Sequence, residues 1–231
     1  MSINIDNFTI TKKTKQFIMM TAKKTGTART TLKVVNKRAG RKTETAPLKW
    51  KVATTLLKAM KEDTKMKNVR IMLAAGFFTG LRISDILRLR WKDLLSDSFE
   101  IVEQKTGKLR SIKIVPAFRG IINDVYDNET LNTFVCRSGS YNSENNNKAI
   151  TVMSANKRIK RAFDKYGVDA QNASSHTLRK TFARRIWEFN GKTDEALIYL
   201  SELLGHSSTK MTRKYIGITK QRIDNLYDCL F

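Results

Sequence analysis

The sequence predicts an α+β domain that is mainly α-helical and carries one small antiparallel β-sheet. From Pro47 onward, apolar residues recur at the three- and four-residue spacing of amphipathic helices through most of the chain. Strand-like runs flank a turn at Thr106-Gly107, which is the pattern of a β-hairpin. We find no internal repeat, so a single helical domain with one hairpin is the expected architecture.

The expected helices begin and end at residues with known positional preferences. Pro47 suits the first turn of a helix, Gly80 follows the end of the next one, and Gly167 is a typical stop. Ser84 is placed to cap a short helix through its side chain. We expect helices at about residues 47–60, 66–78, 84–89, 117–127, 150–166, 176–189, 194–204, 208–215 and 219–230.

The expected strands are short. Residues 99–102 and 111–115 would form the hairpin, and Pro116 would end its second strand. Residues 131–135 are expected to form a third short strand. Residues 137–147 have no periodicity and predict a loop.

Residues 1–46 differ in composition from residues 47–231, which predicts a basic N-terminal arm ahead of the folded domain. Between Lys12 and Lys42 there are eleven Lys or Arg residues and no Asp or Glu. Such a segment can lie along phosphates, or it can be a tail that its charge keeps soluble. The sequence leaves both interpretations open.

The charge of the whole chain predicts a polyanionic partner. Lys and Arg total 44 against 21 Asp and Glu, a formal net charge of +23. Because this excess repels itself in the compact state, a partner such as nucleic acid would relieve it. We favour nucleic acid over an acidic membrane surface, since no basic amphipathic anchor or lipidation signal is apparent.

The two cysteines predict neither a zinc site nor a disulfide framework. Cys136 and Cys229 are far apart, and no Cys-x-x-Cys or clustered histidine accompanies them. A reducing cytoplasm, of a bacterial cell or a phage-infected host, is therefore the expected compartment. We find no signal peptide and no apolar run near the ~18 residues of a membrane span.

Chemically informative residues concentrate between positions 176 and 215. Both histidines of the chain fall there, and His176 and Arg179 share one face of a helix because they are three residues apart. With two upstream segments, these motifs resemble the tyrosine recombinase (phage integrase) family over roughly residues 48–225. The segments that carry the resemblance are Thr79-Gly80-Leu81-Arg82-Ile83-Ser84-Asp85-Ile86-Leu87, Gln104-Lys105-Thr106-Gly107-Lys108, His176-Thr177-Leu178-Arg179, Leu204-Gly205-His206-Ser207-Ser208 and Arg213-Lys214-Tyr215-Ile216.

The resemblance implies a DNA breaking-rejoining fold for residues 47–231 and a set of catalytic residues. Tyr215 would be the nucleophile that forms a 3′-phosphotyrosyl intermediate, although its phenol, with a pKa near ~10, needs help to lose its proton. Arg82 and Arg179 would stabilise the phosphate charge through their planar, permanently charged forks. Lys105 would protonate the leaving oxygen, with Lys108 as the competing assignment. The implied catalytic set is Arg82, Lys105, His176, Arg179, His206 and Tyr215.

The remaining assignments from the resemblance concern the histidines and one carboxylate. His176 would be a hydrogen-bond donor and acid/base group, and His206 would donate to a phosphate oxygen. Asp85 either orients Arg82 or is a plain carboxylate at a helix start. No metal or other cofactor is expected. We read one apolar group around Arg82 as core: Phe77, Phe78, Leu81, Leu87 and Trp91.

The implied activity is site-specific recombination of double-stranded DNA, as in integration, excision or inversion by a mobile element. A homotetramer on DNA at synapsis is the expected assembly, and an accessory DNA-bending protein is a further candidate partner. Only 46 residues precede Pro47, fewer than a family core-binding domain needs, so the chain resembles short members such as fimbrial-switch invertases. Two alternatives stay open, a type IB topoisomerase-like nicking-closing activity and a non-catalytic DNA-binding protein.

Overall fold

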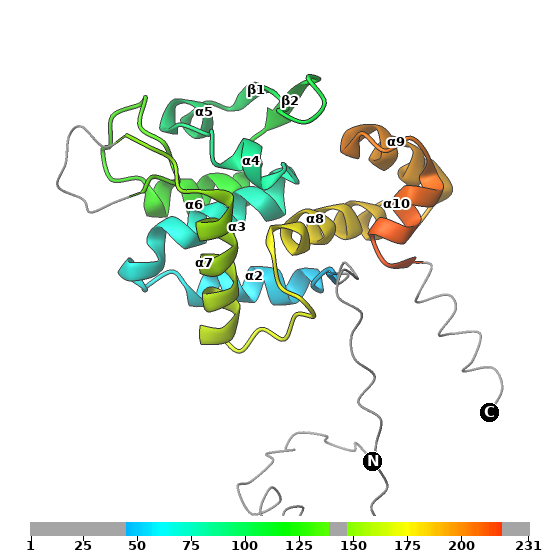
Figure 1. Cartoon of the computed structure of the whole chain (residues 1–231), viewed down its shortest axis with the longest axis horizontal. Coiled ribbons are helices and arrows are strands. Elements are labelled where there is room, and N and C mark those ends of the chain that lie inside the picture. The colour runs from blue at the N-terminus through cyan, green and yellow to red at the C-terminus, as the bar shows by residue number, and fades with distance from the viewer. Residues whose placement is uncertain (1–44, 139–146, 219–231) are drawn as a thin grey trace, which may run out of the picture. The chain divides into compact units, whose positions relative to one another are not determined.

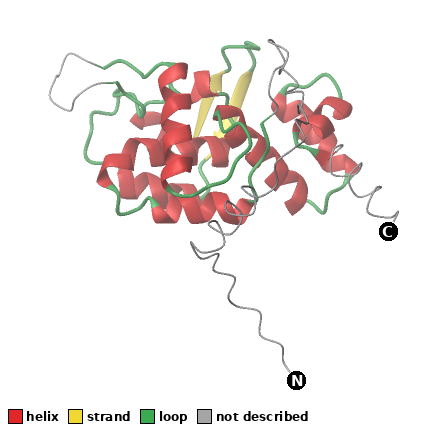
Figure 2. Ribbon diagram, turned by 60° about the horizontal axis from the view of Figure 1, so that its bottom comes forward, coloured by secondary structure: helices red, strands yellow, loops and turns green. Residues whose placement is uncertain are grey.

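The computed structural model describes residues 45–138 and 147–218, which form a group of helices with one β-hairpin at its edge (Figures 1 and 2). The predicted N-terminal arm up to residue 44, the centre of the predicted loop at 137–147 and the predicted helix at 219–230 lie outside these residues. The elements are α2 (Trp50–Ala59), η1 (Thr64–Met66), α3 (Lys67–Thr79), α4 (Ile83–Ile86), α5 (Trp91–Leu95), β1 (Ser98–Val102), β2 (Leu109–Lys113), α6 (Pro116–Val125), α7 (Val152–Lys165), α8 (Ser175–Phe189), α9 (Asp194–Leu204) and α10 (Thr209–Tyr215).

Helix α3 is the centre of the larger hydrophobic cluster. Every residue from Val69 to Phe77 is buried, because α2, α6, α7 and α8 all pack around this helix. A Cβ atom added at Gly76 would lie 2.7 Å from Leu178, so this glycine lets α8 approach α3 closely. The apolar group predicted around Arg82 belongs to this core, with Phe78 only partly buried.

Helix α8 also takes part in a second, smaller cluster with α9 and α10. Its first half contributes Leu178 to the larger cluster, whereas Ala183 and Trp187 pack with the second. Helix α9 contributes Ala196, Leu197, Leu200 and Leu204 to this second cluster. One helix therefore fixes α9 and α10 relative to α3. No helix in the described ranges is long and apolar enough to cross a bilayer.

The hairpin is confirmed, and its second strand starts two residues earlier than predicted. Strands β1 and β2 pair antiparallel, with Phe99 opposite Ile112 on the buried face. The turn ends at Gly107, whose φ of 65° suits glycine and whose N–H donates to the carbonyl of Glu103. The predicted α+β, mainly helical fold is confirmed.

The third strand predicted at residues 131–135 is wrong. This segment makes a single bridge, Phe134 with Arg90, and otherwise turns. Its carbonyls at Leu131 and Thr133 accept from the first N–H groups of α5, which otherwise lack partners in the helix. The segment therefore covers the start of α5, a helix that the sequence did not predict.

The cap predicted at Ser84 is also wrong. Helix α4 already begins at Ile83, with Arg82 in the extended conformation just before it, and no side chain caps the helix. Gly80 ends α3 in the left-handed conformation, as predicted. Pro116 stands at the first turn of α6, where its missing N–H costs nothing.

Candidate active site

The six residues implied by the resemblance come from separate elements that α8 brings together. Arg82 precedes α4, Lys105 lies in the hairpin turn, and Tyr215 is the last residue of α10. His176 and Arg179 lie on the first turns of α8, and His206 follows α9. The hairpin and α9 lie on the same side of α8 (Figure 1).

A glycine lies where these elements meet. Gly205, in the left-handed conformation that ends α9, has no side chain to keep the neighbouring segments apart. A Cβ atom added there would lie 3.8 Å from Arg82 Nη2 and 3.8 Å from Thr106 Cγ2. The end of α9, the first arginine and the hairpin turn are therefore neighbours.

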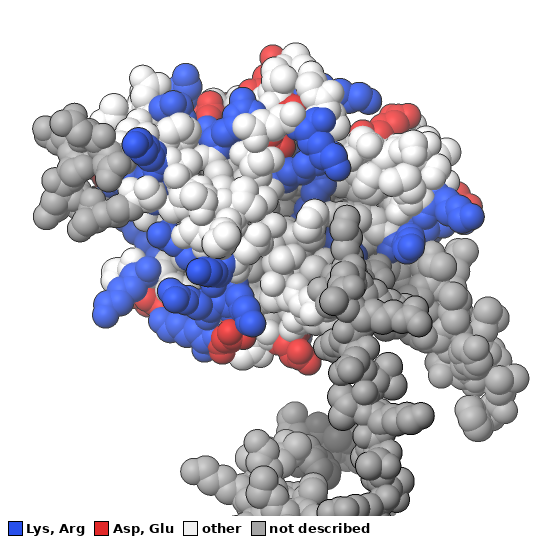
Figure 3. Space-filling model, in the orientation of Figure 1, with Lys and Arg blue, Asp and Glu red and all other residues white. Residues whose placement is uncertain are grey.

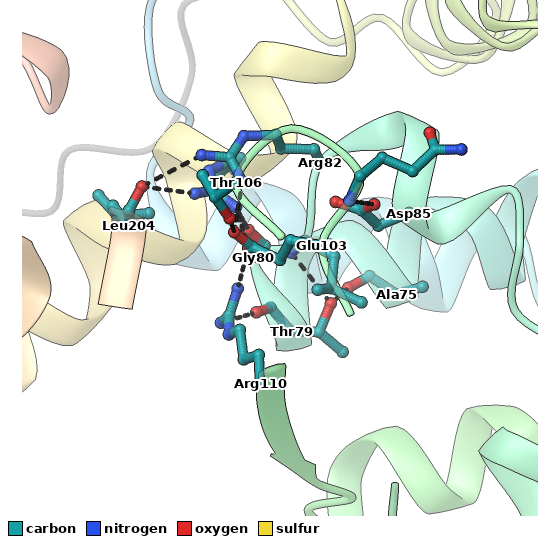
Figure 4. Close-up of polar contacts among 12 residues, drawn as sticks. Ala75, Thr79, Gly80, Arg82, Asp85, Glu103, Thr106, Arg110 and Leu204 are labelled. Carbon is teal, nitrogen blue, oxygen red and sulfur yellow. Dashed lines mark hydrogen bonds and ion pairs between the residues drawn. The ribbon is translucent and has the colours of Figure 1, made fainter. Parts of the chain in front are cut away.

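Two guanidinium groups share the carbonyl that ends α9 (Figure 4). Arg179 Nη2 donates to the Leu204 oxygen at 3.0 Å, and Arg82 Nη2 donates to it at 3.4 Å. Because this carbonyl has no partner within its helix and lies at the negative end of the helix dipole, cations suit it. A further bond of 2.5 Å joins Arg179 Nη1 to the Gly80 carbonyl. The two arginines are thus side by side and fixed by backbone oxygens.

Glu103 lies among these arginines and was missed by the sequence analysis. Its Oε2 accepts from Arg82 Nη1 at 2.6 Å and from Thr106 Oγ1 at 2.8 Å. Its Oε1 lies 3.6 Å from Arg110 Nη1 and 3.8 Å from Arg179 Nη1. Burial alone would raise the pKa of this carboxyl, but the hydrogen bonds from Thr106 and Arg82 and the neighbouring charges hold it below its usual value. The carboxylate is therefore ionised and ties the hairpin to both arginines.

Arg110 carries the third guanidinium of this group, and the sequence analysis assigned no role to it. It donates through Nη2 to the Thr79 carbonyl at 2.5 Å. Burial and the charge of Arg179 lower its pKa to about 10, while Glu103 acts in the opposite direction. Three guanidinium groups thus surround one carboxylate. The excess of positive charge favours binding of a further anion.

The hairpin turn carries both candidate lysines, and both are exposed. The turn is fixed by Asp85, which is fully buried and whose Oδ1 accepts from the Gln104 backbone N–H at 2.9 Å. Asp85 therefore contacts the backbone beside Lys105, a contact that neither of the two predicted roles of this carboxylate included. Lys105 is also the hairpin lysine whose charge acts on both histidines.

The two histidines have lowered pKa values for similar reasons. His176 is exposed as a residue, yet partial desolvation of its ring and then the charges of Lys180 and Arg179 lower its pKa. His206 is half-buried, and desolvation followed by the charges of Arg179 and Arg82 lowers its pKa. Both rings are therefore mainly neutral at pH 7.

Tyr215 is half-buried beside His206. The two rings are 5.1 Å apart at their centroids and inclined at 74°. Burial raises the pKa of the phenol, whereas the charges of Arg179 and Arg82 and a hydrogen bond with Arg179 act against this rise. Lys180, which the sequence did not single out, is buried with its Nζ 5.2 Å from the Tyr215 ring centroid and donates to the Thr45 carbonyl.

The donors gathered here suit a phosphodiester. Paired guanidinium groups can bind its non-bridging oxygens, and a phenol beside them can act as a nucleophile. Within residues 45–138 and 147–218, no three His, Cys, Asp or Glu side chains lie close enough to ligate a metal together.

The chain belongs to the phage integrase family, whose sequence profile matches residues 46–222. It is 32% identical over 159 residues to the probable integrase/recombinase YoeC of Bacillus subtilis, covering 67% of this chain and 80% of that protein. It is 31% identical over 164 residues to the tyrosine recombinase XerC of Xanthomonas campestris, covering 69% of this chain and 47% of that protein.

Solved structures show the same fold. The XerH recombinase in a post-cleavage complex with difH DNA superposes with a TM-score of 0.55 at 22% identity, over 84% of this chain and 55% of that one. A lambda integrase dimer bound to a COC′ core site gives 0.54 at 18% identity, over 78% and 50% of the two chains. The chain thus spans about half the length of XerC and of these structural relatives.

Proposed function

We propose that this protein is a site-specific tyrosine recombinase that cuts and rejoins duplex DNA through a covalent 3′-phosphotyrosyl intermediate. The observation that carries the proposal is the pairing of Arg82 and Arg179 on the Leu204 carbonyl, with the phenol of Tyr215 next to Arg179. Each guanidinium has five N–H groups, so donors remain for a phosphate after these contacts.

The chemistry follows from the placement of these groups. With both non-bridging oxygens bound by the arginines, the phosphorus accepts attack by the Tyr215 oxygen. The bond to the 5′ oxygen breaks, and Lys105 supplies the proton that this oxygen needs. Because the phosphotyrosyl ester keeps the bond energy, a 5′ hydroxyl from another strand can reverse the step and rejoin DNA.

Two basic regions support duplex DNA as the partner. Lys and Arg side chains gather over α7 and again between the hairpin and α9 (Figure 3). Helix α7 carries five cations, Lys157, Arg158, Lys160, Arg161 and Lys165. Rows of cations of this kind bind phosphates without regard to sequence. Since the XerH and lambda integrase structures contain DNA, we extend DNA binding and assembly as a homo-oligomer on DNA to this chain.

The test is formation of a covalent adduct with a suicide substrate. A binding site is first selected from a randomised duplex pool with the full chain, and a nicked version is then incubated and run on a denaturing gel. The unchanged chain should form an adduct and Tyr215→Phe should form none, with DNA binding nearly unchanged. Tyr199→Phe is the matched control, because Tyr199 is 63% exposed on α9. An adduct in the Tyr215→Phe protein would contradict the proposal.

A further inference from the structure

The segment just ahead of α2 is bonded to helix α8, and we call this segment, residues 45–48, the strap. The backbone N–H of Leu48 donates to Thr181 Oγ1 at 2.9 Å, and the carbonyl of Thr45 accepts from Lys180 Nζ at 2.7 Å. Thr181 is 1% exposed and Lys180 is 6% exposed, so both side chains are shielded from solvent. Two consecutive residues of α8 therefore hold the strap.

The strap also lies beside the chain that follows Tyr215. A Cβ atom added at Gly217 would lie 3.9 Å from Pro47 Cδ, so these two residues are neighbours. Arg184, also on α8, donates through Nη1 to the Ile216 carbonyl at 3.3 Å. Helix α8 thus holds both the strap and the segment in which α10 ends.

Lys180 joins the strap to the ring of Tyr215. Its Nζ lies over this ring, 5.2 Å from the ring centroid. A cation in this place is attracted by the negative face of the aromatic ring, and more strongly where solvent is excluded. Because a buried ammonium group is costly unless it is hydrogen bonded, the bond to the Thr45 carbonyl stabilises the cation over the ring.

Three contacts surround the side chain of Tyr215. Arg179 hydrogen bonds with the phenol, His206 meets the ring at an inclination of 74°, and Lys180 lies over the ring. Successive residues of a helix point about 100° apart, so Arg179 and Lys180 approach the tyrosine from different directions. Tyr215 is the last residue of α10, and helix ends fray, so these contacts rather than the helix fix its side chain.

We propose that Lys180 is a positioning residue for Tyr215, and that the strap holds Lys180 in the place that this role requires. The part of the proposal that concerns catalysis rests on the proposed recombinase function. There, Lys180 keeps the phenolic oxygen beside Arg179, where a phosphate bound by the arginines would meet it. In this role Lys180 neither binds the phosphate nor exchanges a proton.

The alternative role for Lys180 is a direct contact with a DNA phosphate. Burial argues against this role, because Lys180 is almost fully covered whereas most of the cations of α7 are exposed. The two roles also differ in what they change. Loss of a phosphate contact weakens binding and lowers its salt dependence. Loss of a positioning contact slows cleavage and leaves both of these quantities as they were.

The contact itself is tested by NMR of the full chain without DNA, labelled with ¹³C at the ε carbon of lysine. The ε protons of Lys180 should resonate upfield of those of exposed lysines, because the current in the Tyr215 ring shields them. Lys180→Arg removes the signal and so assigns it. Tyr215→Phe keeps a ring and should keep the shift, whereas Tyr215→Leu should abolish it. An unshifted Lys180 signal in the unchanged chain would overturn the proposal without reference to activity.

Two substitutions of Lys180 test its part in cleavage. Lys180→Met keeps an unbranched side chain without the cation and should slow single-turnover cleavage of the suicide substrate by about tenfold to a hundredfold, since misplacement by ~1 Å can cost about 10²-fold. Lys180→Arg keeps a cation that can donate to the Thr45 carbonyl, so it should retain most of the rate. Lys58→Met is the matched control, because Lys58 is exposed on α2. A weaker affinity and a lower salt slope in Lys180→Met, with normal cleavage at saturating DNA, would overturn the positioning role.

The part played by the strap is tested at Thr181. Thr181→Val removes the oxygen that accepts from Leu48 at nearly constant volume, so the Lys180 signal should move toward that of an exposed lysine and cleavage should slow. Thr181→Ser keeps the hydroxyl and should preserve both. If the valine protein keeps the signal and the rate of the unchanged chain, the strap does not hold Lys180.

The outcomes separate this proposal from the proposed function. The Lys180 signal is read without DNA, so a shifted signal in a chain that forms no adduct refutes only the recombinase function. A shifted signal together with normal cleavage by Lys180→Met would overturn the positioning role and leave the recombinase function intact.

Discussion

Removal of the charge of Glu103 should destabilise the protein, because three guanidinium groups share this carboxylate. Glu103→Gln keeps the shape and a carbonyl acceptor for Arg82, but leaves Arg82, Arg110 and Arg179 without their common anion. A pair of charges at ~4 Å contributes about 4 kcal/mol at an effective dielectric constant of ~20. The cost of desolvating the carboxylate offsets much of the attraction summed over the three arginines. Breaking a buried ion pair typically costs about 3–5 kcal/mol of stability. Because glutamine still accepts a hydrogen bond, we expect Glu103→Gln to lower the free energy of unfolding by about 3 kcal/mol, the low end of this range.

Urea unfolding measures this loss. The midpoint should fall while the slope with denaturant stays constant, since the surface exposed on unfolding does not change. Glu100→Gln is the matched control, because Glu100 is exposed on β1 and its change should stay within about 0.5 kcal/mol. Inorganic phosphate should stabilise the Glu103→Gln protein more than the unchanged one, because an anion can replace the carboxylate.

The pH dependence of the stability difference between the unchanged protein and Glu103→Gln tests whether the Glu103 carboxylate causes it. The pKa of Glu103 is depressed in the folded state, so its contribution is complete above the unfolded value of ~4.3 and is lost as pH falls through the folded value. The two proteins should therefore differ by a constant amount above pH ~5 and converge in acid. A loss below about 0.5 kcal/mol at pH 7 would refute the stabilising role assigned to Glu103.

Further predictions concern the hairpin lysines, the basic arm and one glycine. The Lys105→Ala protein should cleave ordinary DNA slowly, but it should cleave DNA with a 5′-bridging phosphorothiolate normally, because that leaving group needs no proton. If only Lys108→Ala shows this pattern, Lys108 is the general acid instead of Lys105. Removal of residues 1–44 should weaken DNA binding at ~0.1 M salt by tenfold or more and should make the binding constant less sensitive to salt, measured as the slope of log K against log salt concentration. If affinity and slope are both unchanged, the arm is only a solvated tail. Gly80→Ala should destabilise the protein by more than about 1 kcal/mol, because the φ of Gly80 is 60° and a Cβ atom there would lie 2.1 Å from Phe182. The control is Gly120→Ala in α6, whose Cβ would meet no atom within 4 Å, so this change should be neutral or stabilising by up to about 1 kcal/mol. Equal melting temperatures of the two variants would contradict this prediction.

The parts of the fold that local sequence determines could be predicted. Periodicity and end signals predicted eight of the described helices, all but α5 and the short η1, and the Thr106-Gly107 turn predicted the hairpin. The segment at residues 131–135 has strand-like composition, but tertiary contacts decide its state, because its carbonyls bond to the start of α5. Helix α5 has only five residues, too few for a periodic pattern.

The candidate catalytic residues were accessible from motifs, whereas the groups that position them were not. Glu103 directly precedes the turn of a hairpin that carries several cations, which is a signal in retrospect, but no sequence rule says which of the 44 cations of the chain it pairs with. The Leu204 carbonyl that joins Arg82 and Arg179 belongs to the backbone, so no residue type announces it. Lys180 looks like one more cation of a basic chain until its distance to the Tyr215 ring is known.

The most direct test of the central claim is to locate the covalent bond to DNA. After trapping on the suicide substrate, nuclease and trypsin digestion should leave a nucleotide on the peptide that begins at Tyr215, since cleavage after Lys214 and Lys220 releases residues 215–220. The DNA strand released in the same reaction should carry a free 5′ hydroxyl that polynucleotide kinase can label. A nucleotide attached to any other residue, or a strand released with a 5′ phosphate, would contradict the assignment of Tyr215 as the nucleophile of this site.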